Sequence, residues 1–326
     1  STQHTMNLGA TYGATDSRLR HRLSARYFDS NNRNLLDGIE DSSSTSERLT
    51  LGYQADIALG DNMLALALEH EDTQFEQRGA AVWGDPNQDQ EMDVTSVIAD
   101  FQGRSIEDIT WLLSARLDNN SDFDDIVTGR ASIAWDVAGE TMLSANIGTG
   151  QKAPTFIERY GYFPGQFVGN PDLKPEQSVS YDIGIEQRIA SSASIQIAVF
   201  RQTVEDEIDG FVFDPESGLF TARNLDTTSK RGGVEVGARW TVSEHLDLSM
   251  NYTYTDSTEN GATELRRPRH AGNATIDANF LEGRARLMLA ADFGGTRQDI
   301  YFPPWPEPSE IVALDSYWLL DLTAQY

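Results

Sequence analysis

The 326-residue sequence predicts an all-β chain that spans a membrane as a transmembrane antiparallel up-and-down β-barrel. Three observations predict this fold class. Apolar and polar residues alternate along the chain with a period of two, short and long connections between the alternating segments follow one another in turn, and the second face of most segments is polar. Together these features are typical of strands that present one face to lipid and the other to water.

Strict alternation identifies the strands. In residues 246–255, for example, Leu246, Leu248, Met250, Tyr252 and Tyr254 each precede a polar residue. Alternation over eight to ten residues gives a strand one apolar and one polar face. About fifteen segments show it, and no convincing helical stripe appears, so the chain is expected to be all-β. These segments are 5–14, 18–29, 47–59, 62–76, 93–103, 108–118, 126–138, 141–150, 176–189, 193–204, 224–242, 244–257, 267–281, 283–298 and 315–326.

The connections between these strands alternate in length. Short turns are expected at 59–62, 137–140, 190–192, 243–245 and 281–283, whereas long loops are expected at 30–46, 77–92, 119–125, 151–175, 205–223, 258–266 and 299–314. This pattern puts the short turns at one end of the sheet and the long loops at the other. A soluble sandwich has no reason to adopt it, but a membrane barrel has short periplasmic turns and long outer loops.

The polar second face has two interpretations. In a soluble sandwich the apolar face forms the core, whereas in a membrane barrel the apolar face meets lipid and the polar face lines a wet lumen. Several strands are longer than the five or six residues usual in soluble sheets. Aromatic residues such as Trp135, Trp240 and Phe293 fall near strand ends, as interfacial girdles require. The membrane barrel is therefore the favoured interpretation.

Composition excludes several classes of function. The chain has 25 basic and 51 acidic residues, and this net charge of −26 argues against nucleic-acid binding. It has no cysteine, which excludes disulfides and thiolate metal sites. None of the five histidines is paired at metal-ligand spacing, and no nucleophile elbow or phosphate loop occurs, so no enzyme is expected.

Residues 148–187 carry a family resemblance. Gly148 to Thr155 contain a Lys-Ala-Pro segment, and Asn170 to Glu176 read Asn-Pro-Asp-Leu-Lys-Pro-Glu before the next strand. This resembles the receptor barrel of TonB-dependent outer-membrane receptors of the cobalamin and siderophore type. There, a strand ending in Lys-Ala-Pro enters a long outer loop, and an Asn-Pro-x-Leu-x-Pro-Glu segment starts the next strand.

The resemblance also implies what this chain lacks. Such receptors have about twenty-two strands, a plug domain that fills the lumen and a short TonB-binding segment before the plug. Residues 1–326 are therefore expected to be a partial receptor barrel, a fragment without the plug domain or the last strands. An odd strand count cannot close by antiparallel pairing alone, which favours this interpretation.

The Asn-Pro motif is expected to be structural. Pro171 and Pro175 hold the chain extended as it enters the wall, Leu173 can cover the loop base, and Glu176 can accept hydrogen bonds at the rim. The motif residues taken together are Asn170, Pro171, Leu173, Pro175 and Glu176.

Two groups of loop aromatics are candidate ligand contacts, because converging aromatic tips could cap a large flat molecule such as a corrin ring or an aromatic siderophore. The alternative is that they pack one loop against another. The candidates are Tyr160, Tyr162, Phe163, Phe167, Phe302 and Trp305. The loop at 204–217 is acidic rather than basic, and ferric siderophores are often anionic, which favours a neutral ligand such as cobalamin.

Clustered carboxylates in the 118–125 loop suggest a calcium site, since calcium prefers oxygen ligands. The segment lacks the central Gly and the bidentate Glu of a helix–loop–helix site, and a solvated loop among lipopolysaccharide phosphates is the alternative. The candidate ligands are Asp118, Asp122, Asp124 and Asp125. No other cofactor is expected.

The sequence thus predicts part of a TonB-dependent transporter in the outer membrane of a Gram-negative bacterium, taking up a scarce, bulky nutrient through extracellular capture loops. Its expected partners are outer-membrane lipid and lipopolysaccharide, a small-molecule nutrient, and TonB with a plug domain through segments outside this chain. The alternatives are a passive porin-like channel and a structural or adhesive barrel.

Overall fold

The computed structural model describes residues 1–81, 84–106, 108–304 and 306–326, apart from the side chains of residues 105 and 106. Within them, fifteen strands follow one another in chain order through a large antiparallel sheet, and β17 (Ala262–Thr263) pairs with one of these strands. The fifteen are β1 (Thr2–Tyr12), β2 (Leu19–Leu36), β3 (Ile39–Leu59), β4 (Asn62–Gly79), β5 (Gln88–Ile106), β6 (Ile109–Asn120), β7 (Ile126–Asp136), β8 (Thr141–Lys152), β11 (Glu176–Ala190), β12 (Ala193–Glu205), β15 (Ser229–Ser243), β16 (Leu246–Glu259), β18 (His270–Phe280), β19 (Ala285–Gly294) and β22 (Tyr317–Gln325). The all-β prediction is confirmed.

The remaining elements lie within the long connections. They are α1 (Phe156–Tyr160), β9 (Tyr162–Phe163), β10 (Phe167–Val168), β13 (Ile208–Asp214), β14 (Leu219–Asn224), β20 (Arg297–Tyr301) and β21 (Glu310–Leu314). β13, β14, β10 and β9 form a small four-stranded sheet, and β20 pairs with β21. No helix in the described part of the chain is long and apolar enough to cross a bilayer.

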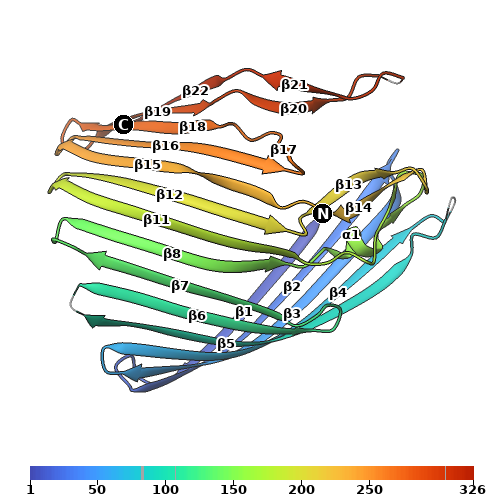
Figure 1. Ribbon diagram of the computed structural model, residues 1–326, viewed down its shortest axis with the longest axis horizontal. Coiled ribbons are helices and arrows are strands. Elements are labelled where there is room, and N and C mark those ends of the chain that lie inside the picture. The colour runs from blue at the N-terminus through green and yellow to red at the C-terminus, as the bar shows by residue number, and fades with distance from the viewer. Residues whose placement is uncertain (82–83, 107, 305) are drawn as a thin grey trace. The chain divides into compact units, whose positions relative to one another are not determined.

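The chain divides into two compact units. Unit 1 comprises Ser1–Ala131, Gly148–Ser178 and Glu205–Asp226, and unit 2 comprises Ser132–Ile147, Val179–Val204 and Thr227–Tyr326. Within unit 1, β1 to β6 run side by side, and within unit 2, β12, β15, β16, β18, β19 and β22 do the same (Figure 1). In each unit the long connections lie at one end of the strands, the loop end, and short connections lie at the other, the turn end. The β2–β3 hairpin of unit 1 is the exception, because its two-residue turn lies at the loop end.

The exposed face of the large sheet is apolar. On β3, Leu51 is 48% exposed, whereas its neighbour Thr50 is only 4% exposed. In unit 2, Ile183 on β11 is 66% exposed and Val199 on β12 is 55% exposed. A soluble sheet would bury these residues, so the observed polarity is that of a barrel whose outer surface faces lipid.

The opposite face of unit 1 carries paired charges. Arg20 donates to Asp56 across the β2–β3 pair at 2.8 Å. Arg26 on β2 lies 2.6 Å from Glu69 on β4, and Arg116 on β6 lies 3.6 Å from the same carboxylate. These pairs satisfy the polar side chains that alternate with the apolar face, as the predicted second face requires.

Two expected loops contain long extensions of the wall strands. The 30–46 loop is the end of the β2–β3 hairpin, which closes in a two-residue turn at Asp37 and Gly38, both with positive φ. Half of the 77–92 loop extends β4 and β5, which end at Gly79 and begin at Gln88. The sequence underestimates the length of these strands. Beyond the part that has one apolar face, most residues on both faces are polar, so apolar and polar residues no longer alternate.

The expected strand at 224–242 also begins elsewhere. Residues 219–224 form β14 in the loop sheet, and β15 starts only at Ser229. The 205–223 and 299–314 loops contain the β13–β14 and β20–β21 hairpins respectively. Short paired strands of this kind fall below the length at which alternation is informative.

Candidate functional site

The long connections of unit 1 fold into a compact cluster. β10 pairs in parallel with β14 through Phe167 and Phe220, and β13 pairs antiparallel with β14. The buried centre of the cluster consists of Phe167, Leu173 and Ala222, and Phe163, Ile208 and Phe220 pack around it. The 153–175 and 205–226 connections therefore share one small apolar core.

The Asn-Pro motif ties these two connections together. Asn170 donates from Nδ2 to the Ala222 carbonyl at 3.1 Å, and its Oδ1 accepts from the Asp172 N–H at 3.0 Å. Leu173 is only 3% exposed within the shared core. Pro171 is exposed and Pro175 is half-buried, at the two ends of the turn.

The motif ends at a carboxylate that also bridges two segments. Glu176 Oε1 accepts from Lys152 Nζ at 2.9 Å and from the Ile208 N–H at 3.1 Å. Beside it, Asn224 accepts from the Lys174 N–H at 2.9 Å and donates to the Lys174 carbonyl at 2.9 Å. These contacts hold the base of the loop cluster against the start of β11.

The helix α1 was not expected from the sequence, although it carries a recognisable signal. Thr155 and Glu158 form a reciprocal capping box, in which each side chain bonds the other residue's backbone N–H at 3.2 and 2.7 Å. The Thr-x-x-Glu spacing is the sequence signature of a helix start. A five-residue helix is too short to show a helical period, so only this signature could have revealed it.

Arg159 on α1 is a buried cation that the sequence did not single out. Its guanidinium forms an ion pair with Asp122 from the 121–125 connection. The same group lies 4.6 Å from the ring centroids of both Phe123 and Tyr160, a stacking geometry that stabilises a desolvated cation. Arg159 therefore joins the β6–β7 connection to the 153–175 connection.

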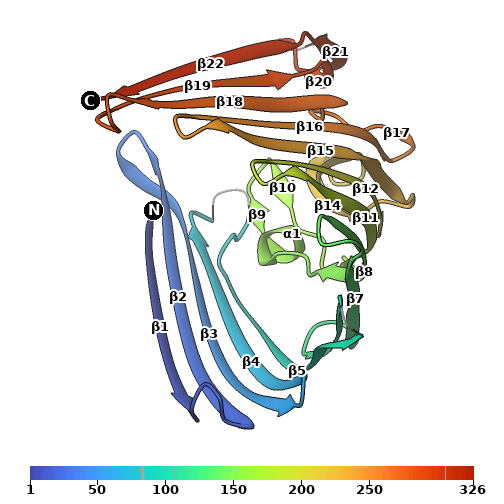
Figure 2. The ribbon, with the colours of Figure 1, turned by 90° about the vertical axis from the view of Figure 1, so that its left-hand side faces the viewer.

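The loop cluster rests on the outer parts of β3 to β5. Phe156 stacks on Phe75 at 5.6 Å between ring centroids, and Gln77 donates to the Tyr162 carbonyl at 2.9 Å. Gln88, which lies opposite Gln77 in the β4–β5 register, donates to the Tyr160 carbonyl at 2.6 Å. Figure 2 shows α1, β9 and β10 on one side of β3, β4 and β5.

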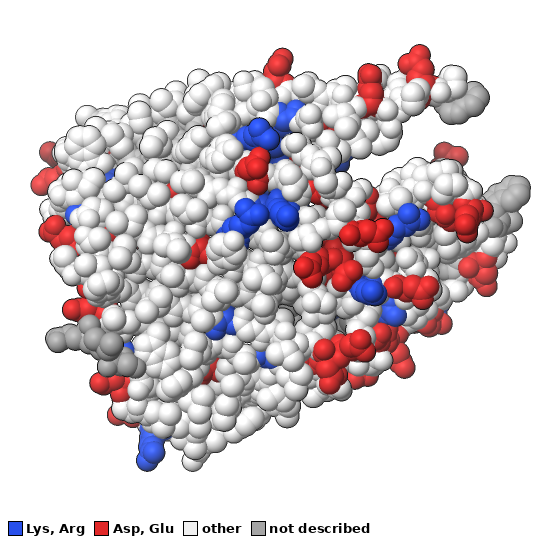
Figure 3. Space-filling model, in the orientation of Figure 1, with Lys and Arg blue, Asp and Glu red and all other residues white. Residues whose placement is uncertain are grey.

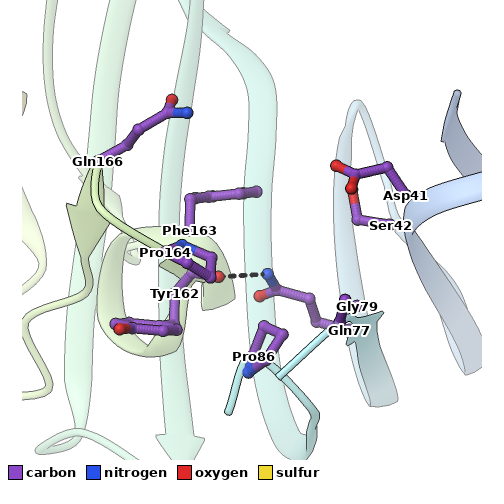
Figure 4. A pocket seen from close by; sticks show the side chains of 10 residues that line it. Asp41, Ser42, Gln77, Gly79, Pro86, Tyr162, Phe163, Pro164 and Gln166 are labelled. Atoms are coloured by element: carbon purple, nitrogen blue, oxygen red, sulfur yellow. Dashed lines mark hydrogen bonds between the residues drawn. The ribbon is translucent and has the colours of Figure 1, made fainter. Parts of the chain in front are cut away.

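Two cavities open where the cluster meets these strands. One, of about 320 Å³, lies between Tyr162, Phe163 and Pro164 on one side and Asp41 and Ser42 on the other (Figure 4). The second, of about 410 Å³, is lined by the Pro154–Ile157 segment and by side chains of β3 to β5. Both have mixed polar and apolar linings, which suits part of a bulky polar ligand.

The structure brings the first predicted aromatic group together in the loop cluster, but most of its side chains are buried or half-buried there. Phe167 is 6% exposed in the apolar core, and Phe163 packs against that core. Tyr160 is half-buried below Arg159, and Tyr162 is half-buried at the mouth of the 320 Å³ cavity.

The second predicted aromatic group belongs to unit 2. Phe302 is 70% exposed beside the β20–β21 hairpin. Trp305 lies outside the described residues.

The most exposed aromatics of the loop cluster were missed. Phe211 and Phe213 on β13 are 63% and 54% exposed. Phe211 stacks on Phe220 at 4.0 Å, Phe213 meets Phe220 edge-on at 5.7 Å, and Phe167 continues the row. Ile208, Gly210 and Val212 alternate with Asp209, Phe211 and Phe213, which is a strand signal, but the surrounding carboxylates make the segment resemble an acidic loop.

The four candidate calcium ligands are spread over several contacts. Asp118 pairs with Arg116 at 2.7 Å, Asp122 pairs with Arg159, and Asp125 accepts from Asn119 at 2.7 Å. Asp124 is exposed. No group of three or more metal-ligating side chains occurs among the described residues. A calcium site here stays a prediction.

Carboxylates surround the loop cluster. In Figure 3 they gather at the loop end of unit 1, around β4, β13 and β14. Hydrogen bonds from the Ser217 hydroxyl and from the N–H groups of Glu216 and Ser217 lower the pKa of Asp214 at the β13–β14 turn. The cluster thus presents ionised carboxylates beside exposed aromatic rings, a surface that repels anions.

Curated relatives match most of the chain. A protein named "Vitamin B12 transporter BtuB" from Photobacterium profundum is 27% identical over 330 residues, which cover 98% of this chain and 50% of the relative. The protein of the same name from Vibrio vulnificus is 28% identical over 265 residues, covering 81% of the chain and 40% of the relative. The chain spans about half the length of the curated relatives it matches.

Solved structures share the fold. The siderophore receptor PirA from Acinetobacter baumannii superimposes with a TM-score of 0.81 at 16% identity, covering 99% of this chain and 56% of that protein. A mutant of the ferric enterobactin receptor PfeA from Pseudomonas aeruginosa gives 0.78 at 15% identity, covering 99% and 54%. At these identities the likeness establishes the fold alone.

The family assignment rests on the sequence as a whole. The names of these relatives are those of transporters and receptors rather than of enzymes, as expected from the sequence. The family model "TonB dependent receptor-like, beta-barrel" matches residues 1–326. Because this match spans the chain, the protein belongs to the TonB-dependent receptors of the outer membrane, and its residues are those of the β-barrel.

Proposed function

We propose that residues 1–326 supply part of the wall and several capture loops of an outer-membrane receptor that takes up a scarce, bulky nutrient in a Gram-negative bacterium. The family and the lipid-facing apolar surface support the location in the wall. The folded cluster at the loop end of unit 1 supports capture, because binding loops held by a shared core are preorganised for a ligand.

The exposed aromatic row carries this proposal. Phe211 and Phe213 present large apolar surfaces to solvent, while their stacking on Phe220 fixes their orientation. Rigid aromatic rings bind flat ligands with little loss of side-chain entropy. Burial in the cluster makes Phe167 and Phe163 supports for this row, while Tyr162 remains a contact candidate at the cavity mouth.

The preferred ligand class is cobalamin-like. Two similar sequences are named vitamin B12 transporters, and the carboxylates around the aromatic row disfavour an anionic ferric siderophore. Energy coupling through TonB and a plug domain is proposed for the complete receptor, as is usual for the family. A passive channel and an adhesive barrel are the alternatives that the uptake experiment below distinguishes.

The test uses the full-length receptor that contains these residues. Binding of cyanocobalamin and of ferric enterobactin is measured by intrinsic fluorescence quenching for the parent protein and for Phe213→Ala. The matched control is Tyr12→Ala, an exposed aromatic at the turn end of unit 1. We expect saturable cyanocobalamin binding that Phe213→Ala weakens about tenfold, as for loss of one stacked ring, and that Tyr12→Ala leaves intact.

Uptake by cells separates the alternatives. Labelled cyanocobalamin should accumulate only when TonB is present, whereas a passive channel would admit it without TonB. An adhesive barrel would bind no small nutrient in either strain. Tighter binding of ferric enterobactin than of cyanocobalamin would contradict the ligand assignment while leaving the receptor role in place.

A further inference from the structure

A basic groove lies on the lipid-facing side of unit 2. Directly opposite residues in antiparallel strands share a face, so the register places Arg201, Gly232 and Asp256 in one row across β12, β15 and β16. The row towards the loop end contains Lys230, and the row towards the turn end contains Val199. The Val199 row belongs to the exposed apolar surface, so all three rows face outwards.

The groove exists because one position in the middle row has no side chain. Gly232 lies between Arg201 and Asp256, and the space around it measures about 480 Å³. A Cβ at Gly232 would meet its nearest neighbour, the Phe200 carbonyl oxygen, at 3.4 Å. The strand therefore tolerates a side chain there, and the opening is not forced by backbone crowding.

Two cations at the groove lack a carboxylate partner. Arg201 and Lys230 are both exposed, and within the described residues neither lies within 4.0 Å of an acidic oxygen. They are diagonal neighbours across the β12–β15 pair, a separation of about 7–8 Å between backbone positions that long side chains can span. Two like charges at this spacing repel unless an anion lies between them.

The one carboxylate in the lining is already compensated. Asp256 lies 3.1 Å from Arg269, so that pair adds no net negative charge. Arg231, the third basic residue of the lining, pairs with Glu264 at 2.9 Å. Arg201 and Lys230 thus give the groove a net positive charge in a protein whose overall charge is −26.

The other side of the groove is apolar. Tyr181, Ile183 and Val199 line it, and all three are exposed on the lipid-facing surface. Figure 3 shows basic side chains gathered over the loop-end halves of β12 and β15, next to a broad uncharged surface on the same strands. A ligand that fills this groove must place an anion and a hydrocarbon chain within a few ångströms of each other.

We propose that this groove binds a phosphate-bearing membrane lipid, with its phosphate between Arg201 and Lys230 and an acyl chain along Tyr181, Ile183 and Val199. The phosphate supplies the missing anion, and charge-assisted hydrogen bonds from a guanidinium and an ammonium suit its oxygens. A soluble phosphate compound would leave the apolar side unused. The site lies on the wall and is independent of which nutrient the loops capture.

The test measures lipid retention by the full-length receptor. Diphosphoryl lipid A and its fully dephosphorylated form are titrated into the delipidated protein in detergent, and bound lipid is counted by native mass spectrometry. The parent protein should prefer the phosphorylated form. Arg201→Ala with Lys230→Ala should weaken that binding by roughly 25-fold, taking about fivefold for each basic side chain beside an anionic lipid.

A second variant keeps both charges. Gly232→Val places a β-branched side chain into the groove and should weaken phosphorylated-lipid binding at least fivefold, because the phosphate can no longer reach both cations. The matched control is Arg188→Ala with Arg284→Ala, which removes two exposed charges at the turn end of unit 2.

Any of three results would overturn the proposal. One is equal binding of the phosphorylated and dephosphorylated lipids by the parent protein. The second is a change of less than twofold in both groove variants, and the third is an equal loss in the control. Cyanocobalamin binding, measured on the same variants, should stay unchanged, so that failure of the lipid site and failure of the receptor role are distinguishable.

Discussion

Replacing Arg159 by alanine should loosen the loop cluster of unit 1. The guanidinium is 9% exposed, and its partner Asp122 is 21% exposed. Arginine at this position closes an ion pair and stacks on Phe123 and Tyr160. Alanine removes all three contacts and leaves a largely buried carboxylate without its cation.

The magnitude follows from burial. Removing one partner of a fully buried ion pair costs about 3–5 kcal/mol, and each stacked cation adds about 0.5–2 kcal/mol. Because water reaches one fifth of Asp122 and screens the pair, we expect a cost below the fully buried range, about 2–3 kcal/mol, for the local opening of the 153–175 connection. Since about 1.4 kcal/mol is a factor of ten, protected amides should exchange roughly 30- to 150-fold faster.

The assay is hydrogen–deuterium exchange on the full-length receptor. The reporting amides are those of Gly161, Gly169 and Asn170, which donate to carbonyls within the connection at 2.7–2.9 Å. Arg159→Lys keeps the charge but loses the planar stacking, so it should fall between the parent protein and Arg159→Ala. Asp122→Asn completes a double-mutant cycle.

The reasoning would be refuted by two outcomes. One is exchange in Arg159→Ala within threefold of the parent protein. The other is an additive cycle, in which the effects of Arg159→Ala and Asp122→Asn sum within about 0.5 kcal/mol, because residues that share a buried contact must couple.

Three further predictions concern packing, backbone space and pH. Leu173→Ala should destabilise the loop cluster by about 2–4 kcal/mol, seen as faster exchange in β13 and β14, whereas Leu36→Ala at an exposed hairpin tip should have no effect. Gly233→Ala should lower the thermal unfolding temperature and Gly232→Ala should not, because a Cβ at Gly233 would lie 1.9 Å from a carbonyl oxygen. Burial raises the pKa of Glu264, but hydrogen bonds and charges from Arg231 and Arg267 outweigh this effect and hold the pKa below its ordinary value. The stabilisation that ionised Glu264 gives the folded state is therefore complete above its ordinary pKa of 4.5. It is lost as the pH falls through the lower folded-state pKa. Glu264→Gln should flatten the acid-induced increase in exchange of residues 260–269, and an unchanged acid profile would contradict this assignment.

Alternation predicted the large sheet well because one face of each strand is apolar and the other is polar. Leu246 to Tyr254 alternate in sequence, and β16 extends from Leu246 to Glu259 with Met250 and Tyr252 exposed. Where this difference between the two faces ends, the alternation in the sequence ends as well. Up to the apolar residues at the hairpin tip, the outer parts of β2 and β3 are polar on both faces, and backbone hydrogen bonds, which sequence periodicity does not record, carry their pairing.

The site was less accessible from sequence, because its geometry depends on contacts between distant segments. Composition identified the aromatics of the 151–175 loop but could not show that Phe167 is buried against Ala222, more than fifty residues away. Arg159 carried no motif of its own, since its partner lies 37 residues earlier. Phe211 and Phe213 were hidden by the acidic residues that flank them.

The β2–β3 hairpin has a consequence for how this surface can change over generations. Its outer part is joined by backbone pairs and by side-chain bonds such as Asn31 to Thr45 and Asn34 to Ser42, and it closes at Asp37 and Gly38 with φ values of 51° and 81°. Backbone pairing of this kind fixes the path of the main chain but requires few particular side chains. Substitutions there should therefore cost little stability, so the tip can change in sequence while the wall below is retained. The same tolerance makes the Asp37–Gly38 turn a suitable place to insert a foreign peptide without disturbing the wall.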